Sequence, residues 1–416
     1  MRDEASSPVV PVGSRDGRGD KDNRHIVFPV NRLHLRNAMP LKADFHKRTF
    51  HFGFDARTSR GAMKDKTSWF IKIWDPEAPE IFGLGECAPL QGLSREDIPK
   101  LDQVLDIVVG RIMHGQLGLP VISDSPFDTL LRLNAVLKEY FSDFFLQQHP
   151  AVTFALETAL LDLGQGGKQT VFNNSFVKGQ PVPINGLVWM GGLDFMLQQV
   201  EIKIRDGYRC LKLKVGGLDF EKEVDILQYI RRKYFRENIV VRLDANGAFK
   251  VEDALYKLKQ LSRFEVHSIE QPIKAGSPEL PGLCQASPIP IALDEELIGV
   301  ATREEKEKLL EKIRPQYIIL KPSLHGGLFG CQEWIELAES RKVGWWVTSA
   351  LESNIGLNAI SQFAANYPIP LPQGLGTGEI YTDNIPSPLK VDRGLLSYDL
   401  AGRWDLLEFG QPKKTE

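Results

Sequence analysis

The sequence predicts an α/β protein in which a C-terminal β/α (TIM-like) barrel follows an N-terminal α+β capping domain. Three observations lead to this prediction. From residue 181 onward, short apolar runs alternate with stretches of helical spacing, several runs end in a charged residue, and these charges recur at intervals of 24 to 30 residues. One strand, one helix and the return to the next strand need about thirty residues. Parallel strands of this kind can close into a barrel whose reactive groups come from the C-terminal ends of several strands.

The length and charge of the chain limit the functions to consider. Its 416 residues, of which 42% are apolar and 25% are charged, exceed what one core usually serves, so we expect two domains. The 51 Lys and Arg residues nearly balance the 54 Asp and Glu residues. This balance predicts neither a nucleic-acid partner nor a membrane partner. No apolar run approaches the length of about twenty residues that crosses a bilayer.

The four cysteines are far apart in the sequence and form no Cys-x-x-Cys pair. They are Cys87, Cys210, Cys284 and Cys331. Zinc-binding and redox cysteines usually occur in closely spaced pairs, and disulfide frameworks are typical of small secreted domains. We therefore expect reduced, mostly buried thiols in a cytoplasmic protein.

The first part of the chain is expected to contain a tail and the capping domain. Residues 1–26 carry many small and charged side chains and few large apolar ones, which is typical of a flexible tail. Residues 27–165 begin with alternating apolar residues, as in 49–54 and 68–74, and continue with helical spacing. Strands followed by helices predict an α+β unit, and a segment rich in Gly, Gln and Asn at 164–178 marks its end.

Eight candidate strands lie in the barrel region, which we place at residues 180–380. Eight strands favour a closed barrel over an open sheet. The helices between them have apolar faces, one of which carries Val224, Leu227 and Ile230 on the same side. Beyond this region the alternation stops, and we expect residues 381–416 to pack back on the capping domain.

Three acidic residues follow neighbouring candidate strands at Asp244, Glu270 and Asp294. Magnesium prefers oxygen ligands and keeps positions open for water or substrate. Taken singly, an acid after a strand more often caps the next helix, but Glu270 stands before Gln271-Pro272 and is a poor cap. Three acids in register at one end of a barrel predict a metal site.

Lysines lie on both sides of these acids along the chain. Lys212 and Lys214 are two apart in one strand, so their side chains point the same way, and their apolar neighbours suit the interface between barrel and helices. We therefore place both lysines inside the barrel, where a second cation and a metal would lower the pKa of an amine toward that of a general base. Lys321 ends a strand on the opposite side and is a candidate acid, base or fixed charge.

A metal beside an amine indicates removal of a proton next to a carboxylate, with the cation stabilising the enediolate. An ordered series of motifs extends this interpretation to most of the chain, from about residue 31 to residue 409. The motifs are Gly83-Leu-Gly-Glu-Cys-Ala-Pro-Leu90, Phe154-Ala-Leu-Glu-Thr-Ala, Ile184-Asn-Gly-Leu-Val-Trp-Met190, Lys212-Leu-Lys214, Leu243-Asp-Ala-Asn-Gly-Ala-Phe249, Ile269-Glu-Gln-Pro272, Leu293-Asp-Glu-Glu296 and Leu320-Lys-Pro-Ser-Leu-His-Gly-Gly327. In this order they resemble the muconate-lactonizing branch of the enolase superfamily, and within it the o-succinylbenzoate synthase family.

The resemblance implies a reaction and a cofactor. The reaction is a syn elimination of water from a dicarboxylate, 2-succinyl-6-hydroxy-2,4-cyclohexadiene-1-carboxylate, which gives 2-succinylbenzoate in menaquinone biosynthesis. By the same resemblance, the three acids would bind Mg²⁺. Lys214 would be the base and then the acid, Lys212 would polarise it, and Lys321 would stabilise the enediolate by charge or by a cation–π contact.

Substrate contacts are implied in the capping loop and after the last two strands. The candidate residues are Ser59, Arg60, Ser349, Glu352, Gly374 and Gly376. Backbone N–H groups of the glycine-rich segment could hold the succinyl carboxylate. A surface role explains Arg60 equally well, and a glycine-rich segment is by default a turn.

Two alternatives stay open. An N-acylamino acid racemase or a dipeptide epimerase shares the first proton abstraction and uses lysines on opposite faces of the substrate. Dipeptide epimerases usually carry an acidic motif at the last strand, where this chain has Gly374-Leu-Gly-Thr-Gly378, so this feature favours the synthase. A barrel that binds ligands without catalysis is the second alternative, and the complete set of lysines and acids argues against it.

Overall fold

The computed structural model describes residues 40–58 and 61–410. The predicted flexible tail at residues 1–26 and the candidate residues Ser59 and Arg60 lie outside the described residues. No helix within the described ranges is long and apolar enough to cross a membrane. All four cysteines are buried and free, as the sequence predicts.

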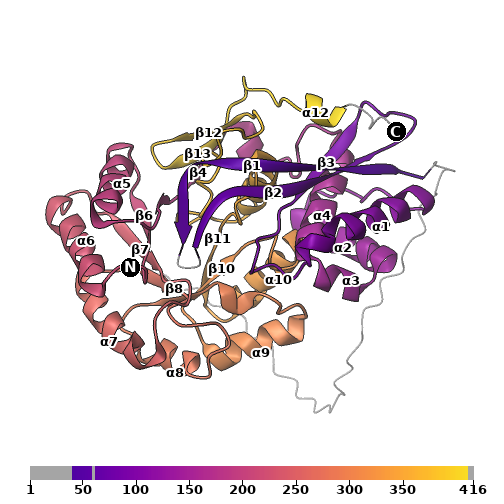
Figure 1. Cartoon of the computed structure of the whole chain (residues 1–416). Coiled ribbons are helices and arrows are strands. Elements are labelled where there is room, and N and C mark those ends of the chain that lie inside the picture. The colour runs from indigo at the N-terminus through magenta and orange to yellow at the C-terminus, as the bar shows by residue number, and fades with distance from the viewer. Residues whose placement is uncertain (1–39, 59–60, 411–416) are drawn as a thin grey trace, which may run out of the picture. The chain divides into compact units, whose positions relative to one another are not determined.

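An antiparallel sheet and four helices form the first part of the described chain (Figure 1). The sheet has the order β1-β2-β3, and the elements are β1 (Lys42–Thr58), β2 (Gly61–Trp74), β3 (Phe82–Cys87), α1 (Leu101–His114), α2 (Pro126–Phe141), α3 (Asp143–Gln148) and α4 (Pro150–Gly164). Helix α4 is buried along almost its whole length and packs on β2 and β3. Two glycines of β3 permit this contact, because a Cβ atom at Gly83 or Gly85 would lie 1.9 Å from a carbonyl oxygen of α4.

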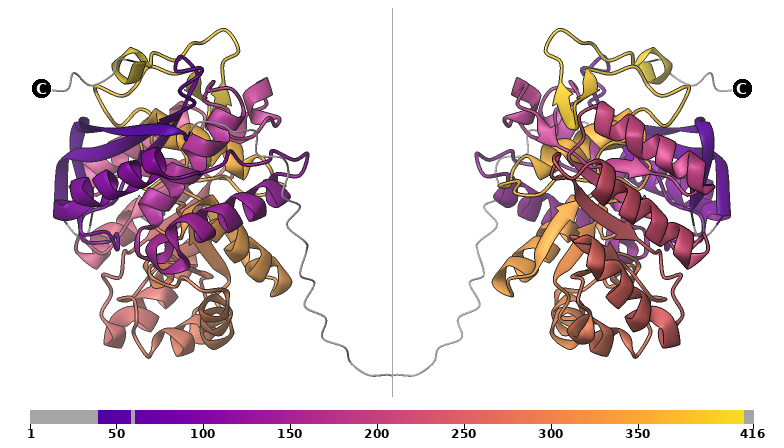
Figure 2. Two further views of the ribbon diagram at one scale, coloured as in Figure 1. Left: turned by 90° about the vertical axis from the view of Figure 1, so that its right-hand side faces the viewer. Right: turned by 90° about the vertical axis from the view of Figure 1, so that its left-hand side faces the viewer.

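Strands and helices then alternate in the order of a β/α barrel. The elements are β4 (Val182–Pro183), β5 (Gly186–Val188), α5 (Leu193–Arg205), β6 (Cys210–Lys214), α6 (Phe220–Lys233), β7 (Val240–Asp244), α7 (Val251–Leu261), β8 (Ser268–Glu270), α8 (Leu280–Ala286), β9 (Ile291–Leu293), α9 (Arg303–Ile313), β10 (Tyr317–Leu320), α10 (Gly327–Ser340), β11 (Gly344–Val347) and α11 (Asn354–Ala364). Short 3₁₀ helices occur at Ile98–Lys100, Phe176–Lys178, Ser262–Phe264 and Glu295–Leu297. Figures 1 and 2 show the helices outside the strands.

Within the described ranges, β5 to β11 form one parallel sheet in sequence order. A short extended segment closes the ring, since Gln373 bridges in parallel to Ile184, just before β5, and Gly374 bridges in parallel to Thr348, just after β11. The predicted last strand is therefore reduced to two bridging residues. The predicted class, a β/α barrel preceded by an α+β part, is confirmed.

The side chains of β6 alternate between two environments. Leu211 and Leu213 are fully buried in the core between strands and helices, whereas Lys212 and Lys214 line a cavity inside the barrel. This alternation follows from the two-residue period of a strand. It brings the two amines to the inner side of the ring.

The C-terminal segment contacts both the barrel and the first sheet. Strands β12 (Leu389–Asp392) and β13 (Leu395–Tyr398) form an antiparallel sheet with β4, and the short α12 (Leu407–Gly410) lies near β2. There, Phe409 packs against Phe70 with ring centroids 5.0 Å apart and accepts a hydrogen bond of 2.8 Å from Lys72 Nζ. The domain limits at 27–165, 180–380 and 381–416 stay predictions.

Candidate active site

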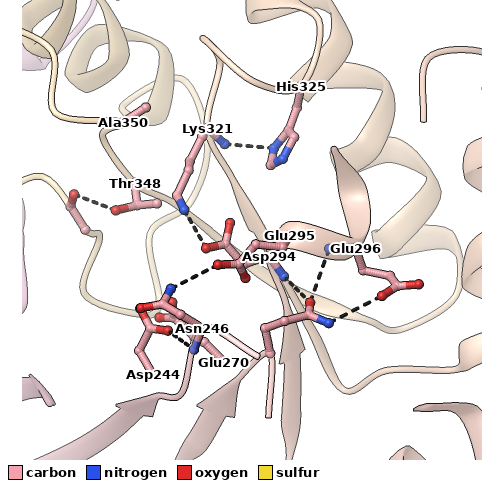
Figure 3. A network of polar contacts seen from close by, with 12 residues as sticks. Asp244, Asn246, Glu270, Asp294, Glu295, Glu296, Lys321, His325, Thr348 and Ala350 are labelled. Atoms are coloured by element: carbon pink, nitrogen blue, oxygen red, sulfur yellow. Dashed lines mark hydrogen bonds and ion pairs between the residues drawn. The ribbon is translucent and has the colours of Figure 1, made fainter. Parts of the chain in front are cut away.

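Three buried carboxylates lie close together at the C-terminal ends of adjacent strands (Figure 3). Asp244 ends β7, Glu270 ends β8 and Asp294 directly follows β9, and none is more than 1% exposed. Lys214, Asp244 and Glu270 are direct neighbours across the ladder from β6 to β8. Because these neighbouring strands end at the same level, the charged residues lie at one height of the barrel.

Three amines face these carboxylates. Lys212 Nζ donates to Glu270 Oε2 at 2.5 Å and lies 3.0 Å from Asp244 Oδ2. Lys214 Nζ donates to the same Asp244 oxygen at 2.6 Å. From the other side of the ring, Lys321 Nζ, at the end of β10, donates to Asp294 Oδ2 at 2.5 Å. The cluster therefore contains as many amines as carboxyl groups.

Burial and charge change the proton affinities of this cluster. The pKa of Lys214 is lowered, first by burial and then by the neighbouring charge of Lys212, although Asp244 partly offsets this. The other two lysines have raised pKa values, because the carboxylates outweigh their burial. Burial raises the pKa of Glu270 to about 8; Lys212 opposes this increase, and the other two carboxylates add to it. Among the three amines, Lys214 is thus the one whose environment favours the neutral form.

The carboxylate oxygen atoms of this cluster are the groups that could bind a cation. Glu270 Oε1 and Asp294 Oδ1 are buried and accept no hydrogen bond from any residue that the structure describes, although a buried acceptor without a partner is costly. Oxygen donors are what a hard divalent cation requires. Across the described ranges, no three acidic, thiol or imidazole side chains already converge as metal ligands, and here the amines lie against the carboxylates. A bound cation would have to share the carboxylates with these amines.

A cavity of about 350 Å³ opens onto the amines. Lys212, Lys214 and Lys321 line it together with Asn246, whereas the carboxylates lie behind them. The remaining walls come from the first sheet and its following loop, from the first strand of the barrel and from the last two, at Gly61, Ala62, Met63, Leu90, Gln91, Leu93, Asn185, Leu187, Trp189, Thr348, Ser349, Ala350, Leu351, Gly374, Gly376 and Thr377. The mixture of apolar and polar walls suits a small organic molecule with polar groups.

The structure separates the candidate substrate residues into two groups. Ser349, Gly374 and Gly376 line the cavity. Glu352 does not: its side chain is fully buried and accepts hydrogen bonds from Ser323 Oγ at 2.6 Å, Ser349 Oγ at 2.8 Å and the Ala350 N–H at 2.6 Å. Glu352 therefore holds the wall that Ser349 and Ala350 form, and its contact with substrate would be indirect.

Sequence reasoning did not single out Asn246 or His325 as functional residues. Asn246 Oδ1 accepts a hydrogen bond of 2.8 Å from Lys214 Nζ, and its Nδ2 donates to Glu295 Oε1 at 3.0 Å. His325 Nδ1 accepts from the Lys321 N–H at 3.0 Å (Figure 3). Both residues are part of the quoted motifs, but only their contacts distinguish them from ordinary turn residues.

Comparisons with known proteins find relatives that cover most of the chain. A family model described as enolase C-terminal domain-like matches residues 196–400. An o-succinylbenzoate synthase of Desulfotalea psychrophila is 43% identical over 86% of this chain and 98% of the relative. A D-Ala-D/L-Ala epimerase of Cytophaga hutchinsonii is 26% identical over 68% of this chain and 72% of the length of the relative.

The same fold occurs among solved structures. The crystal structure of MenC from Desulfotalea psychrophila matches with a TM-score of 0.76 and 40% identity, and covers 86% of this chain and 99% of that chain. Sequence and fold therefore agree over most of the length of both proteins. The chain belongs to the o-succinylbenzoate synthase family of the enolase superfamily.

Proposed function

We propose that this protein is a Mg²⁺-dependent o-succinylbenzoate synthase, a hydro-lyase that removes water from 2-succinyl-6-hydroxy-2,4-cyclohexadiene-1-carboxylate. The product is 2-succinylbenzoate, and the proposed pathway is menaquinone biosynthesis in the cytoplasm. One observation carries the proposal: the amines of Lys214 and Lys321 reach one cavity from β6 and β10, on opposite sides of three buried carboxylates. The 43% identical relative with this activity supports the choice of substrate.

Asp244, Glu270 and Asp294 would hold the metal ion. Their burial, their position on adjacent strands and the two unpaired oxygens support this assignment. When bound, Mg²⁺ supplies positive charge that stabilises the negative charge developing on the substrate carboxylate. The Lys212 amine, which already contacts Glu270 and Asp244, would keep this part of the site positively charged beside the base.

Lys214 would remove the proton from the ring carbon that bears the carboxylate. Its lowered pKa favours the neutral form, and its hydrogen bonds to Asp244 and Asn246 orient the amine. The resulting ammonium would return that proton to the hydroxyl group leaving on the same face. The C–H and C–O bonds break, water departs and the ring becomes aromatic. Lys321, across the cavity, would stabilise the anionic intermediate as a fixed positive charge.

The wall opposite the metal ligands would bind the succinyl carboxylate. Gly374 and Gly376 line this wall, and a Cβ atom at Gly374 would lie 2.1 Å from Thr348 Oγ1, so the close approach of the two segments requires glycine there. We propose that Ser349 and backbone N–H groups of this segment contact the carboxylate. Ser59 and Arg60 stay candidates for a contact from the capping loop.

An assay of both candidate reactions tests the proposal. Purified protein with Mg²⁺ should consume the cyclohexadiene substrate and abolish its absorbance. In D₂O, it should exchange deuterium into N-succinyl amino acids slowly or not at all. Rapid racemisation without dehydration would instead favour the N-acylamino acid racemase, and absence of both reactions would favour a binding protein.

A further inference from the structure

Gln271, the residue after Glu270, has an unusual backbone and is completely buried. Its φ angle is +35°, in the left-handed region that residues other than glycine rarely adopt. Such a conformation is unfavourable and persists only where surrounding contacts enforce it. The contacts of Gln271 must therefore be unusually restrictive.

These contacts join the ends of all three strands that carry the acids. The Gln271 N–H donates to Ala292 O in β9 at 2.9 Å, and the Gln271 carbonyl accepts from the Gly247 N–H, after β7, at 2.6 Å. The residue itself directly follows β8. Its backbone therefore connects β7, β8 and β9 just beyond the height of the carboxylates.

The amide side chain of Gln271 adds a second set of contacts around Asp294. Its Oε1 atom accepts from the Asp294 N–H at 3.4 Å and from the Glu296 N–H at 3.2 Å. Its Nε2 atom donates to Ile273 O at 3.1 Å and to Glu296 Oε2 at 3.3 Å. The amide thus acts as acceptor and donor at once, a combination that an apolar side chain of the same length lacks.

We propose that Gln271 is a positioning residue that sets the spacing of Glu270 and Asp294 for a divalent cation. It is bonded covalently to the first residue and through hydrogen bonds to the backbone of the second. The inference rests on the metal assignment made under Proposed function. Its own support is geometric, because the Gln271 backbone and amide hydrogen-bond to the segments that carry these two side chains. Replacing a residue that orients metal ligands typically lowers metal affinity by about tenfold to a hundredfold.

The test is Mg²⁺ affinity, measured by isothermal titration calorimetry with MgCl₂ alone, of wild type and Gln271→Met. Methionine keeps the side-chain length but neither accepts nor donates strongly. We expect the Kd for Mg²⁺ to rise by about tenfold or more, while saturating Mg²⁺ restores most of the turnover. An unchanged Kd in Gln271→Met would overturn the proposal.

Gln362 in α11 offers a matched control, since its side-chain hydrogen-bond partners lie in residues 169–174 and not around the proposed metal ligands. It is also fully buried, its Oε1 accepts from the N–H groups of Val171 and Phe172, and its Nε2 donates to Gln169 O. We expect both Gln362→Met and Gln271→Met to lower the melting temperature, because each removes buried hydrogen bonds, but Gln362→Met should leave the Kd for Mg²⁺ unchanged. An equal loss of affinity in both variants would show general destabilisation and overturn the specific role.

A second variant keeps the inference testable if Gln271→Met does not fold. Glycine adopts a φ of +35° without strain, so Gln271→Gly removes the amide while relieving the backbone. Its Kd for Mg²⁺ should also rise by about tenfold or more, and an unchanged value would contradict the proposal. Wild type that binds no Mg²⁺ would instead overturn the metal assignment, whereas wild type that binds and variants that bind equally well would overturn only the role of Gln271.

Discussion

Two regions of this protein that contain buried carboxylates differ in the partners of these carboxylates. At the mouth of the barrel, Asp244, Glu270 and Asp294 face amines, and two of their oxygens have no hydrogen-bond partner within residues 40–58 and 61–410. Where α4 and β3 meet the barrel, the buried carboxylates instead accept hydrogen bonds from backbone N–H groups. Glu157 of α4 accepts from the N–H groups of Leu328 and Phe329 at the start of α10.

The other carboxylates of this junction follow the same pattern. Glu86 of β3 accepts from the N–H groups of Ser353 and Gly356 at the start of α11, each at 2.9 Å. Asp162 of α4 accepts from the Leu84 and Thr170 N–H groups at 3.2 and 3.1 Å. Backbone dipoles are fixed in place, whereas lysine ammonium groups can move or lose a proton. The fixed backbone partners at the junction therefore suit a structural role. The lysine partners at the mouth suit a site in which protons are transferred and contacts change.

The largest effect should follow from removing an amine at the mouth. We expect Lys214→Ala to lower kcat by about a thousandfold or more, because the general base is lost, with little change in the fold or in Mg²⁺ binding. Steady-state kinetics and circular dichroism measure both properties. Lys306 of α9 is a matched control, since it is 1% exposed and donates to Glu333 Oε2 at 2.9 Å outside the site. Lys306→Met should keep most of the activity, and retention of wild-type activity by Lys214→Ala would contradict the assigned role.

The pH dependence of stability tests how the junction holds its carboxylates. Burial raises the pKa of Glu157 to about 8 even though two N–H donors oppose the change. The ordinary value is 4.5, so between about pH 4.5 and pH 8 the folded state binds more protons at this site than the unfolded state does. Stability contributed by Glu157 is therefore complete below pH 4.5 and is lost as the pH rises toward 8.

Glu157→Gln should remove this contribution, because the amide does not titrate. Relative to the variant, the free energy of unfolding of wild type, measured by urea unfolding, should fall by on the order of 3 kcal/mol between pH 4.5 and pH 7. Subtracting the two curves cancels the titration of all other groups. Parallel curves would mean that the N–H donors stabilise the charged form as effectively as water does.

Much of the barrel could be predicted from the sequence because its signals are local. The alternation of Leu211, Lys212, Leu213 and Lys214 already separates the two faces of β6, and the chain intervals indicate successive parallel strands. The last strand was harder to predict, because Gln373 and Gly374 form only isolated bridges and do not belong to an apolar run in the sequence. Closure of the ring there depends on contacts with residues far away in the chain.

The parts of the site that sequence reasoning missed depend on tertiary contacts. The sequence predicts Glu352 as a residue that contacts substrate. In the structure, Ser323 and Ser349 donate hydrogen bonds to it behind the cavity wall. Gln271 follows Glu270 in a recognisable motif, but nothing in its residue type indicates a left-handed backbone or contacts with three strands. Sequence spacing identifies which strands end in charge, whereas the supporting contacts come from chain segments that only the fold brings together.

The same exchange as in Glu157 should have a different result at the mouth. Glu270→Gln removes a proposed metal ligand whose Oε1 has no partner in the described part of the chain, so we expect Mg²⁺ affinity to fall by about a hundredfold, roughly 2.7 kcal/mol. Calorimetric titration measures this loss, and Glu157→Gln serves as the control because it should bind Mg²⁺ as wild type does. Equal affinities in wild type and Glu270→Gln would remove the distinction between the two regions.

The smallest effect is expected at a helix cap of the junction. Ser353 Oγ accepts from the Ile355 N–H at 3.3 Å and donates to Glu86 Oε2 at 2.6 Å, so one hydroxyl caps α11 and links it to β3. Ser353→Ala should lower the free energy of unfolding by about 1 kcal/mol or slightly more. Ser125 is the control, because it caps α2 through the exposed Asp128 N–H, and Ser125→Ala should lower the free energy of unfolding by less. Because Glu86 keeps its two N–H donors, Mg²⁺ affinity should not change in either variant, and a change in Ser353→Ala would show that the junction and the mouth are coupled.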